Sequence, residues 1–233
     1  MPGIHALRFV LSLLNKRKVE QMLKIVETAN RSEYRQLLDD MHALRARVFK
    51  DRLQWDVTVT DGREIDVFDA ADPLYLLAVN DTTGRLEGSV RLLPTTGPNM
   101  LRDVFPVLLP DGLVIESPLI WESSRFCIDP DMAHNGRRRI DRVTTELLCG
   151  MVEIGQSACL SHIVSVYDAR MARVFRASNC PAEVIGVPTR IGRVMTYAGL
   201  FEISQVLWDG IAATTNIAGP LLVEDRNAGR KVA

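Results

Sequence analysis

The stretch LYLLAVNDTTGRLEGSVRLL, residues 74–93, decides the fold class. Its first part, Leu74 to Val79, is a continuous apolar run of strand length, which is typical of a buried strand. The four residues Asp81-Thr82-Thr83-Gly84 have the composition of a turn, and Leu86 to Leu93 follows as a second strand. This stretch therefore predicts a β-hairpin whose first strand is buried.

Strands and helices are mixed around this hairpin. The expected strands cover residues 23–27, 119–128, 163–167, 183–187 and 194–203. The expected helices cover residues 32–48, 135–158, 168–178 and 205–217. Ser32 and Asp168 are the expected N-caps. Residues 50–72 are expected to form a long polar loop, and residues 100–105 a single helical turn. This order of elements indicates one α/β domain with a mixed sheet and helices on its faces.

The size and charge of the chain exclude several classes of protein. Its 233 residues are close to the length of one α/β domain, and 47% of them are hydrophobic. A disordered chain, a collagen-like chain and a coiled coil are excluded by this composition. The 28 basic and 29 acidic residues nearly balance, which argues against a protein that coats nucleic acid. We expect residues 1–21 to be an N-terminal extension, 22–223 the folded domain and 224–233 a frayed tail.

Membrane and metal sites are not predicted either. No segment approaches the roughly 20 apolar residues that a membrane-spanning helix needs. The four cysteines form no C-x-x-C pair and have no histidine at metal-ligand spacing. Free thiols in a reducing cytoplasm are therefore expected, with no metal and no permanently bound cofactor.

Two acidic features are candidates for a functional site. Glu122 lies in a strand whose alternation places Ser124 on its face and Arg125 on the other face. The glutamate is either a solvated charge on an edge strand or a carboxylate that lines a cleft and acts as a general base. Asp66 and Asp69 follow Trp55 in the polar loop. They are either solvated, or they suit a positively charged ligand through ion pairing and cation–π contact.

Taken in order, these pieces resemble the LuxI-type acyl-homoserine-lactone synthases, the autoinducer synthases of bacterial quorum sensing. The likeness covers roughly residues 22–205. The matching pattern is Arg45-x-x-x-Phe49, Trp55, Asp66-x-x-Asp69, Arg91, Phe105 and Glu122-x-x-Arg125. The resemblance implies a single-domain three-layer α-β-α sandwich, with a GNAT-like mixed sheet and a V-shaped cleft. It also implies an acyltransferase that joins an acyl thioester to S-adenosylmethionine (SAM) and then closes the lactone with release of methylthioadenosine.

The resemblance assigns roles to the matching residues. Glu122 would take a proton from the SAM amine, and the catalytic group would also include Arg125, Asp69 and Arg91. The SAM site would be built from Arg45, Phe49, Trp55, Asp66, Asp69 and Phe105. Alternatively, the acids and arginines form a purely architectural salt-bridge network, and Phe105 belongs to the core.

The acyl donor is expected to meet an apolar tunnel and a basic docking surface. Candidate tunnel residues are Met100, Leu101, Met151 and Ser165. The resemblance leaves the donor open between acyl carrier protein, which is acidic, and coenzyme A. Arg170, Arg173 and Arg176 are the preferred carrier dock, and the run Arg137, Arg138, Arg139 and Arg142 is the alternative, which loosely resembles a coenzyme A phosphate grip. A GNAT-type acyltransferase for another amine and a non-catalytic binding protein remain the competing functions.

Overall fold

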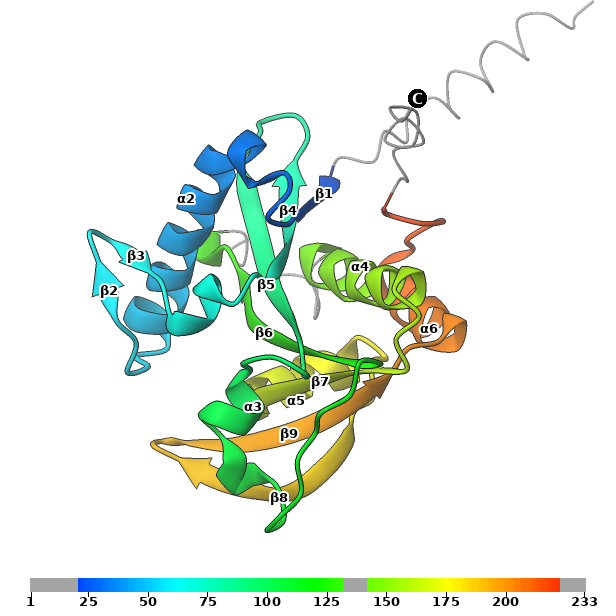
Figure 1. Cartoon of the computed structure of the whole chain (residues 1–233). Helices are drawn as coiled ribbons and strands as arrows, with labels where there is room; N and C mark the ends of the chain where they lie inside the picture. Colours follow the sequence, from blue (N-terminus) through cyan, green and yellow to red (C-terminus); the bar gives the residue numbers. More distant parts are fainter. Residues whose placement is uncertain (1–20, 132–141, 223–233) are drawn as a thin grey trace, which may run out of the picture.

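A seven-stranded mixed sheet forms the centre of the computed structural model, which describes residues 21–131 and 142–222 (Figure 1). The strand order is β1-β4-β5-β6-β7-β9-β8. The strands are β1 (Gln21–Val26), β4 (Leu74–Asn80), β5 (Leu86–Pro94), β6 (Ile120–Ile128), β7 (His162–Asp168), β8 (Glu183–Ile191) and β9 (Val194–Glu202). The predicted hairpin is confirmed, because β4 pairs antiparallel with β5, and Leu76 and Leu77 are both fully buried.

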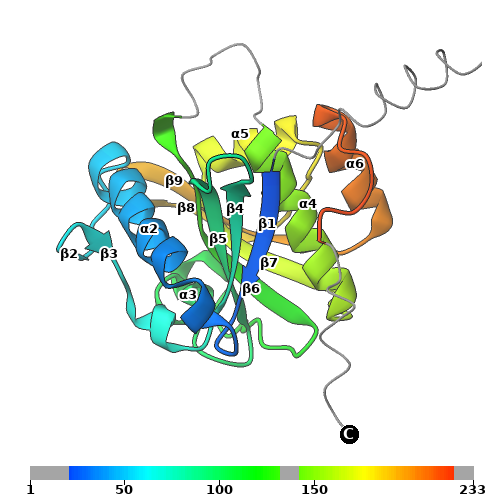
Figure 2. The same ribbon diagram turned by 90° about the horizontal axis from the view of Figure 1, so that it is seen from above.

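Helices cover both faces of the sheet, so the expected three-layer arrangement is confirmed (Figure 2). On one face α2 (Arg35–Arg45) packs through Met41 and Leu44 against Leu77 of β4. The short α3 (Met100–Asp103) shares that face farther along the sheet, where Leu101 packs against Val164 of β7. The opposite face carries α4 (Arg142–Ser157), α5 (Ala169–Ala177) and α6 (Gln205–Thr215).

The sheet opens between its two central strands. The parallel ladder of β6 and β7 joins Ile120–Ser123 to His162–Ser165 and stops there. Beyond this point β6 stays paired with β5, and β7 stays paired with β9. The two strands therefore diverge, which produces the V-shaped opening that the resemblance implied.

The first expected helix differs from the structure at both ends. It is preceded by a 3-10 turn, η1 (Arg31–Glu33), and α2 starts after Tyr34, so Ser32 is not its N-cap. After Arg45 the chain widens into a π-helix, η2 (Ala46–Arg52). π-Helical turns are frequent at functional sites, and this one carries Phe49.

The region that was expected to be a polar loop, residues 50–72, contains short elements. They are a small hairpin of β2 (Val59–Thr60) with β3 (Arg63–Glu64), and a 3-10 turn, η3 (Val67–Ala70). The N-cap prediction for α5 is confirmed, because Asp168 accepts hydrogen bonds from the backbone N–H groups of Arg170 and Met171, both at 2.9 Å. The segment 106–108 forms another 3-10 turn, η4 (Pro106–Leu108).

Three predicted segments lie outside the described residues. They are residues 1–20 of the N-terminal extension, the start of the long helix before Arg142, and the C-terminal tail. Within the ranges that are described, no helix is both long and apolar enough to cross a membrane.

Candidate active site

Six charged side chains meet on the α2 side of the sheet and form what we call the arginine–carboxylate network. Three positive and three negative formal charges balance within it. Its members are Arg45 of α2, Glu64 of β3, Asp66 and Asp69 at η3, Arg91 of β5 and Arg125 of β6.

The two aspartates are oriented by the start of η3. Asp66 accepts a hydrogen bond from Phe68 N at 2.9 Å, and Asp69 Oδ2 accepts one from Asp66 N at 2.8 Å. This reciprocal capping box fixes both carboxylates at one helix end. The three-residue spacing in the sequence thus places both acids where the arginines converge.

Arg45 connects α2 to two of the acids from a fully buried position. Its guanidinium forms a bidentate pair with Asp69, at 2.8 and 3.0 Å, and its Nε donates to Glu64 Oε2 at 2.5 Å. Bidentate pairs of this kind combine strength with a defined geometry.

Arg91 connects β5 to both aspartates. Its guanidinium forms a bidentate pair with Asp66, at 2.5 and 3.0 Å, and also donates to Asp69 at 3.0 Å. Its Nε donates to the hydroxyl of Ser124 on β6 at 3.1 Å. Arg91 therefore holds β5, β6 and η3 together.

Arg125 lies on the same side as Glu122, so the predicted alternation is wrong at this residue. The β5–β6 register shifts between Ser89 and Arg91, and Arg125 has a φ of +54°. Such a bulge adds a residue to one strand and redirects its side chain. Arg125 thereby reaches Glu64 Oε1 at 2.9 Å and Asp66 Oδ2 at 2.8 Å. Left-handed backbone at a non-glycine residue costs about 1–3 kcal/mol and clusters at functional sites.

The network keeps Asp69 ionised. Burial alone would raise the pKa of this carboxyl, but the hydrogen bonds and charges of Arg45 and Arg91 outweigh it and hold the pKa well below its usual range. Tyr75 also donates its hydroxyl to Asp69 at 2.6 Å. Burial and the neighbouring Asp69 charge raise the pKa of Tyr75, so the phenol stays a neutral donor.

Glu122 lies next to the network but does not belong to it. It is fully buried in β6, between β5 and β7, so the alternative of a solvated edge strand is wrong. Its two oxygens accept hydrogen bonds from Met100 N at 2.9 Å and Leu101 N at 2.7 Å, at the start of α3. Burial raises the pKa of Glu122, and these two N–H groups offset part of that effect.

Met100 connects Glu122 to the arginines. While its backbone N–H bonds the carboxylate, its sulfur lies 3.3 Å from Arg125 Nη1 and 3.6 Å from Arg91 Nη2. The buried carboxylate and two of the cations therefore share one neighbour. The predicted catalytic residues Glu122, Arg125, Asp69 and Arg91 are brought together in one place.

Two aromatic rings extend the site towards solvent. Phe49 stacks on Trp55 with ring centroids 5.1 Å apart and an interplanar angle of 29°. The Arg125 guanidinium carbon lies 5.3 Å from the centre of the Phe49 ring. Trp55 is only partly buried, so it can meet a ligand. Phe105 instead packs in the hydrophobic cluster of Leu101 and Leu108.

A small apolar cavity of about 20 Å³ lies on the opposite face of the sheet, between β6, β7, α4 and α6. That is roughly the space of one water molecule, so an acyl chain could enter only if the side chains around the cavity moved apart. Ser123, the residue after Glu122, lines it and supplies the only hydroxyl among its described lining residues. The cavity is lined by Ser123, Leu148, Met151, Val152, Ile163, Phe175, Cys180, Phe201, Ile203 and Leu207.

The four predicted tunnel residues do not lie together. Met151 lines the cavity. Met100 and Leu101 lie across the sheet, beside Glu122. Ser165 does not line the cavity, and its hydroxyl donates to the carbonyl oxygen of Ser123 at 3.0 Å, where β6 and β7 begin to diverge.

Sequence reasoning missed Glu64 and Tyr75 as members of the site. Glu64 contacts both Arg45 and Arg125, and it is 1% exposed. Its only sequence signal is its place two residues before Asp66, which puts both on one side of an extended segment. Tyr75 resembled an ordinary residue of a buried strand.

The structure describes all of the preferred carrier dock on α5 but only one arginine of the alternative cluster. Arg170, Arg173 and Arg176 are all exposed on α5. Within the described ranges, none of these three forms an ion pair. Arg137, Arg138 and Arg139 of the alternative cluster lie outside the described residues, whereas Arg142 pairs with Glu146 of α4.

Comparison with known proteins identifies the family. Residues 29–208 match the model of the autoinducer synthase family. The acyl-homoserine-lactone synthase of Agrobacterium fabrum is 39% identical over 179 residues, covering 76% of this chain and 84% of that protein. The synthase of Pseudomonas aeruginosa is 35% identical over 208 residues, covering 88% and 98%. The solved structure of BjaI, a CoA-dependent acyl-homoserine lactone synthase with SAM and isopentyl-CoA, has a TM-score of 0.76 at 26% identity, covering 85% and 91%.

The fold and the site define an acyltransferase of the GNAT-like α/β class. The mixed sheet, its diverging central strands and the likeness to a solved synthase confirm the fold that the resemblance implied. The chain belongs to the autoinducer synthase family. Its activity is that of an acyl-homoserine-lactone synthase.

Proposed function

We propose that this chain transfers an acyl group from a thioester to the amine of SAM at the opening between β6 and β7. The observation that carries the proposal is the position of Glu122, a buried carboxylate beside the arginine–carboxylate network and next in sequence to a residue of the apolar cavity. The ligands of BjaI, SAM and isopentyl-CoA, support the same substrate pair here. In this proposal the reaction needs no resident cofactor. It takes place in the cytoplasm.

In the first step Glu122 removes a proton from the SAM ammonium group, directly or through one water. A carboxylate has about four lone-pair positions, and two of those of Glu122 are used by Met100 N and Leu101 N. The remaining positions can accept a proton. The neutral amine attacks the acyl carbonyl, an amide bond forms, and the thiol leaves.

In the second step the SAM carboxylate attacks its own γ-carbon. A carbon–oxygen bond forms, the carbon–sulfur bond breaks, and methylthioadenosine leaves with the electron pair. This ring closure needs no further acid or base, because the two reacting atoms belong to one bound molecule.

The SAM site is proposed on the side of the network that faces Trp55. The Phe49–Trp55 stack offers a ring face to the sulfonium, and cation–π contact favours a cation there. Asp66 has the most exposed carboxylate of the network and supplies negative charge. Arg45, Asp69, Arg91 and Arg125 hold the shape of this wall through their mutual pairs. Phe105 would support the wall of the SAM site indirectly, because it packs in the same hydrophobic cluster as Leu101.

The acyl chain is proposed to pass between β6 and β7 into the apolar cavity. Burial of each methylene group there is worth about 0.8 kcal/mol. Met151 lines the cavity, and Ser165 lies where the two strands separate. Met100 and Leu101 would contact the reacting end of the donor, because they bond Glu122.

The direct test is incubation of the purified chain with SAM and a series of acyl thioesters. Formation of acyl-homoserine lactone together with methylthioadenosine is the expected result, measured by mass spectrometry. An acylated product that forms without SAM would favour a GNAT-type transferase for another amine. Binding of SAM without any turnover would favour a non-catalytic protein and overturn the proposal.

We expect that Arg173→Glu raises KM for acyl carrier protein donors by about tenfold and leaves kcat nearly unchanged. The three exposed arginines of α5 suit an acidic carrier, and a reversed charge repels it. Arg190→Glu, an equal charge change on an exposed residue of β8, is the matched control. An uncharged acyl-cysteamine thioester should be used equally well by all three proteins. An unchanged KM for the carrier donor would remove α5 from the docking surface.

A further inference from the structure

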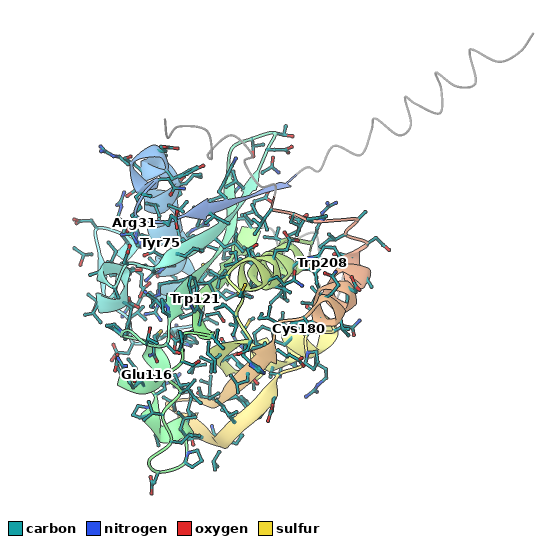
Figure 3. All side chains as sticks on the ribbon, turned by 45° about the vertical axis from the view of Figure 1, so that its right-hand side comes forward. Arg31, Tyr75, Glu116, Trp121, Cys180 and Trp208 are labelled. Carbon is teal, nitrogen blue, oxygen red and sulfur yellow. The ribbon has the colours of Figure 1, made fainter. Side chains whose placement is uncertain are left out.

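A carboxylate on α4 collects hydrogen bonds from two other segments, and we call this arrangement the Glu153 latch. Glu153 accepts a hydrogen bond from the indole Nε1 of Trp208 on α6 at 2.8 Å. It also accepts the backbone N–H of Leu221 at 2.9 Å and that of Leu222 at 2.7 Å. Figure 3 labels Trp208, and it also labels Cys180, which belongs to the wall of the apolar cavity.

The latch joins the elements that form the cavity wall. Helix α4 contributes Leu148, Met151 and Val152 to the cavity, and α6 contributes Leu207, the residue before Trp208. Leu221 and Leu222 pack against the same hydrophobic cluster. Glu153 therefore fixes the distance between α4 and α6 from outside the cavity, without lining it.

The contact between α4 and the chain before α6 is also close. A Cβ atom on Gly155 would lie 3.0 Å from the side chain of Ile203, which lines the cavity two residues before α6 begins. The side chain of Ile203 therefore packs closely against the backbone of α4 at Gly155. The latch opposes movement of α6 away from α4, and so limits how far the cavity can widen.

The residues that line the cavity can distinguish acyl chains mainly by their length. The described lining residues are apolar except for Ser123 and the weakly polar Cys180, so few groups can recognise a substituent on the chain. An apolar pocket discriminates between acyl chains by the fit of the last methylene groups, and each is worth about tenfold or more in specificity.

We propose that Glu153 is a positioning residue that sets the maximum acyl-chain length by holding α6 and residues 221–222 against α4. This inference rests on the proposed function, in which the apolar cavity receives the acyl chain. Loss of the latch would let α6 move outwards, and the cavity would accept longer chains.

The test compares kcat/KM for saturated acyl donors that increase by two carbons. Glu153→Gln places an amide NH₂ among N–H donors, and Trp208→Phe removes the indole donor together with part of the ring. Both should raise kcat/KM for a donor two carbons longer than the preferred one, relative to the preferred donor, by about tenfold. Asp209→Asn, an exposed position on α6, is the matched control and should keep the native ratio.

Further variants separate failure of the latch from failure of the proposed function. Leu207→Ala and Leu207→Phe change the cavity wall directly and should shift the preference to longer and shorter donors. If they shift it but both latch variants do not, the latch has no role in chain length. A uniform loss with all donors in both latch variants gives Glu153 a merely structural role and overturns the inference. A wild-type chain that makes no lactone from any donor overturns the proposed function itself.

Discussion

Replacement of Glu122 by glutamine should lower kcat by about 10²–10⁴-fold, the usual contribution of a general base. Glutamine has nearly the same shape and keeps one oxygen to accept the N–H of Met100 or Leu101, but it cannot take a proton at neutral pH. The fold should persist, which circular dichroism and the thermal midpoint would verify. Methylthioadenosine release measures the loss.

The pH profile gives a second view of the same residue. Because burial raises the pKa of Glu122, activity should fall as the pH is lowered through that raised value, above the ordinary glutamate value of about 4.3. Glu116→Gln, an exposed position labelled in Figure 3, is the control and should keep native kcat. Native turnover in Glu122→Gln would exclude this carboxylate as the base.

Glu64→Gln should destabilise the protein by about 3–5 kcal/mol, the cost of breaking a buried ion pair. The change removes one of three negative charges, so Arg45 and Arg125 lose the carboxylate that contacts them both closely and share only Asp66, which is more distant from Arg45. Urea unfolding monitored by tryptophan fluorescence measures the difference. Activity should fall as well, because Arg125 loses its hydrogen bonds to Glu64 and is held less firmly in its left-handed backbone conformation.

Asp39→Asn is the matched control for this second prediction. Asp39 pairs with Arg63, the residue before Glu64, but both partners are substantially exposed. The urea midpoint should therefore hardly move. Equal midpoints for the wild type and Glu64→Gln would show that the network does not support the fold.

The arginine–carboxylate network should lose stability only at a pH below the ordinary aspartate pKa. Because the arginines hold the pKa of Asp69 below its usual range, the stability from its ionisation is present above the ordinary aspartate pKa of about 3.9. That contribution is lost only as the pH falls through the lowered pKa of the folded state.

The sheet was predictable because its signal is local. The apolar run of residues 74–79 and the turn after it specify a hairpin in any environment, and β4 and β5 form as expected. The capping role of Asp168 was predictable for the same reason, since an N-cap contacts N–H groups of its own helix.

The side of the sheet on which Arg125 lies could not be predicted by alternation. Its direction depends on a register shift against β5, and the shift places Arg125 where Glu64 and Asp66 can pair with it. Nothing in residues 121–126 alone signals that arrangement. The tunnel residues were mixed for a similar reason, because apolar residues of α3 and α4 look alike in sequence although the two helices lie on opposite faces of the sheet.

The balance of charge inside the arginine–carboxylate network has a consequence for ionic strength. The enclosed pairs have their partners within about 3 Å and are shielded from dissolved ions, so added salt changes them little. The exposed arginines of α5 interact with a partner across water, where screening is strong. In concentrated salt the site should therefore keep its shape, while binding of an anionic donor weakens. Added ions should thus slow the association of the donor without changing the rate of the chemical step.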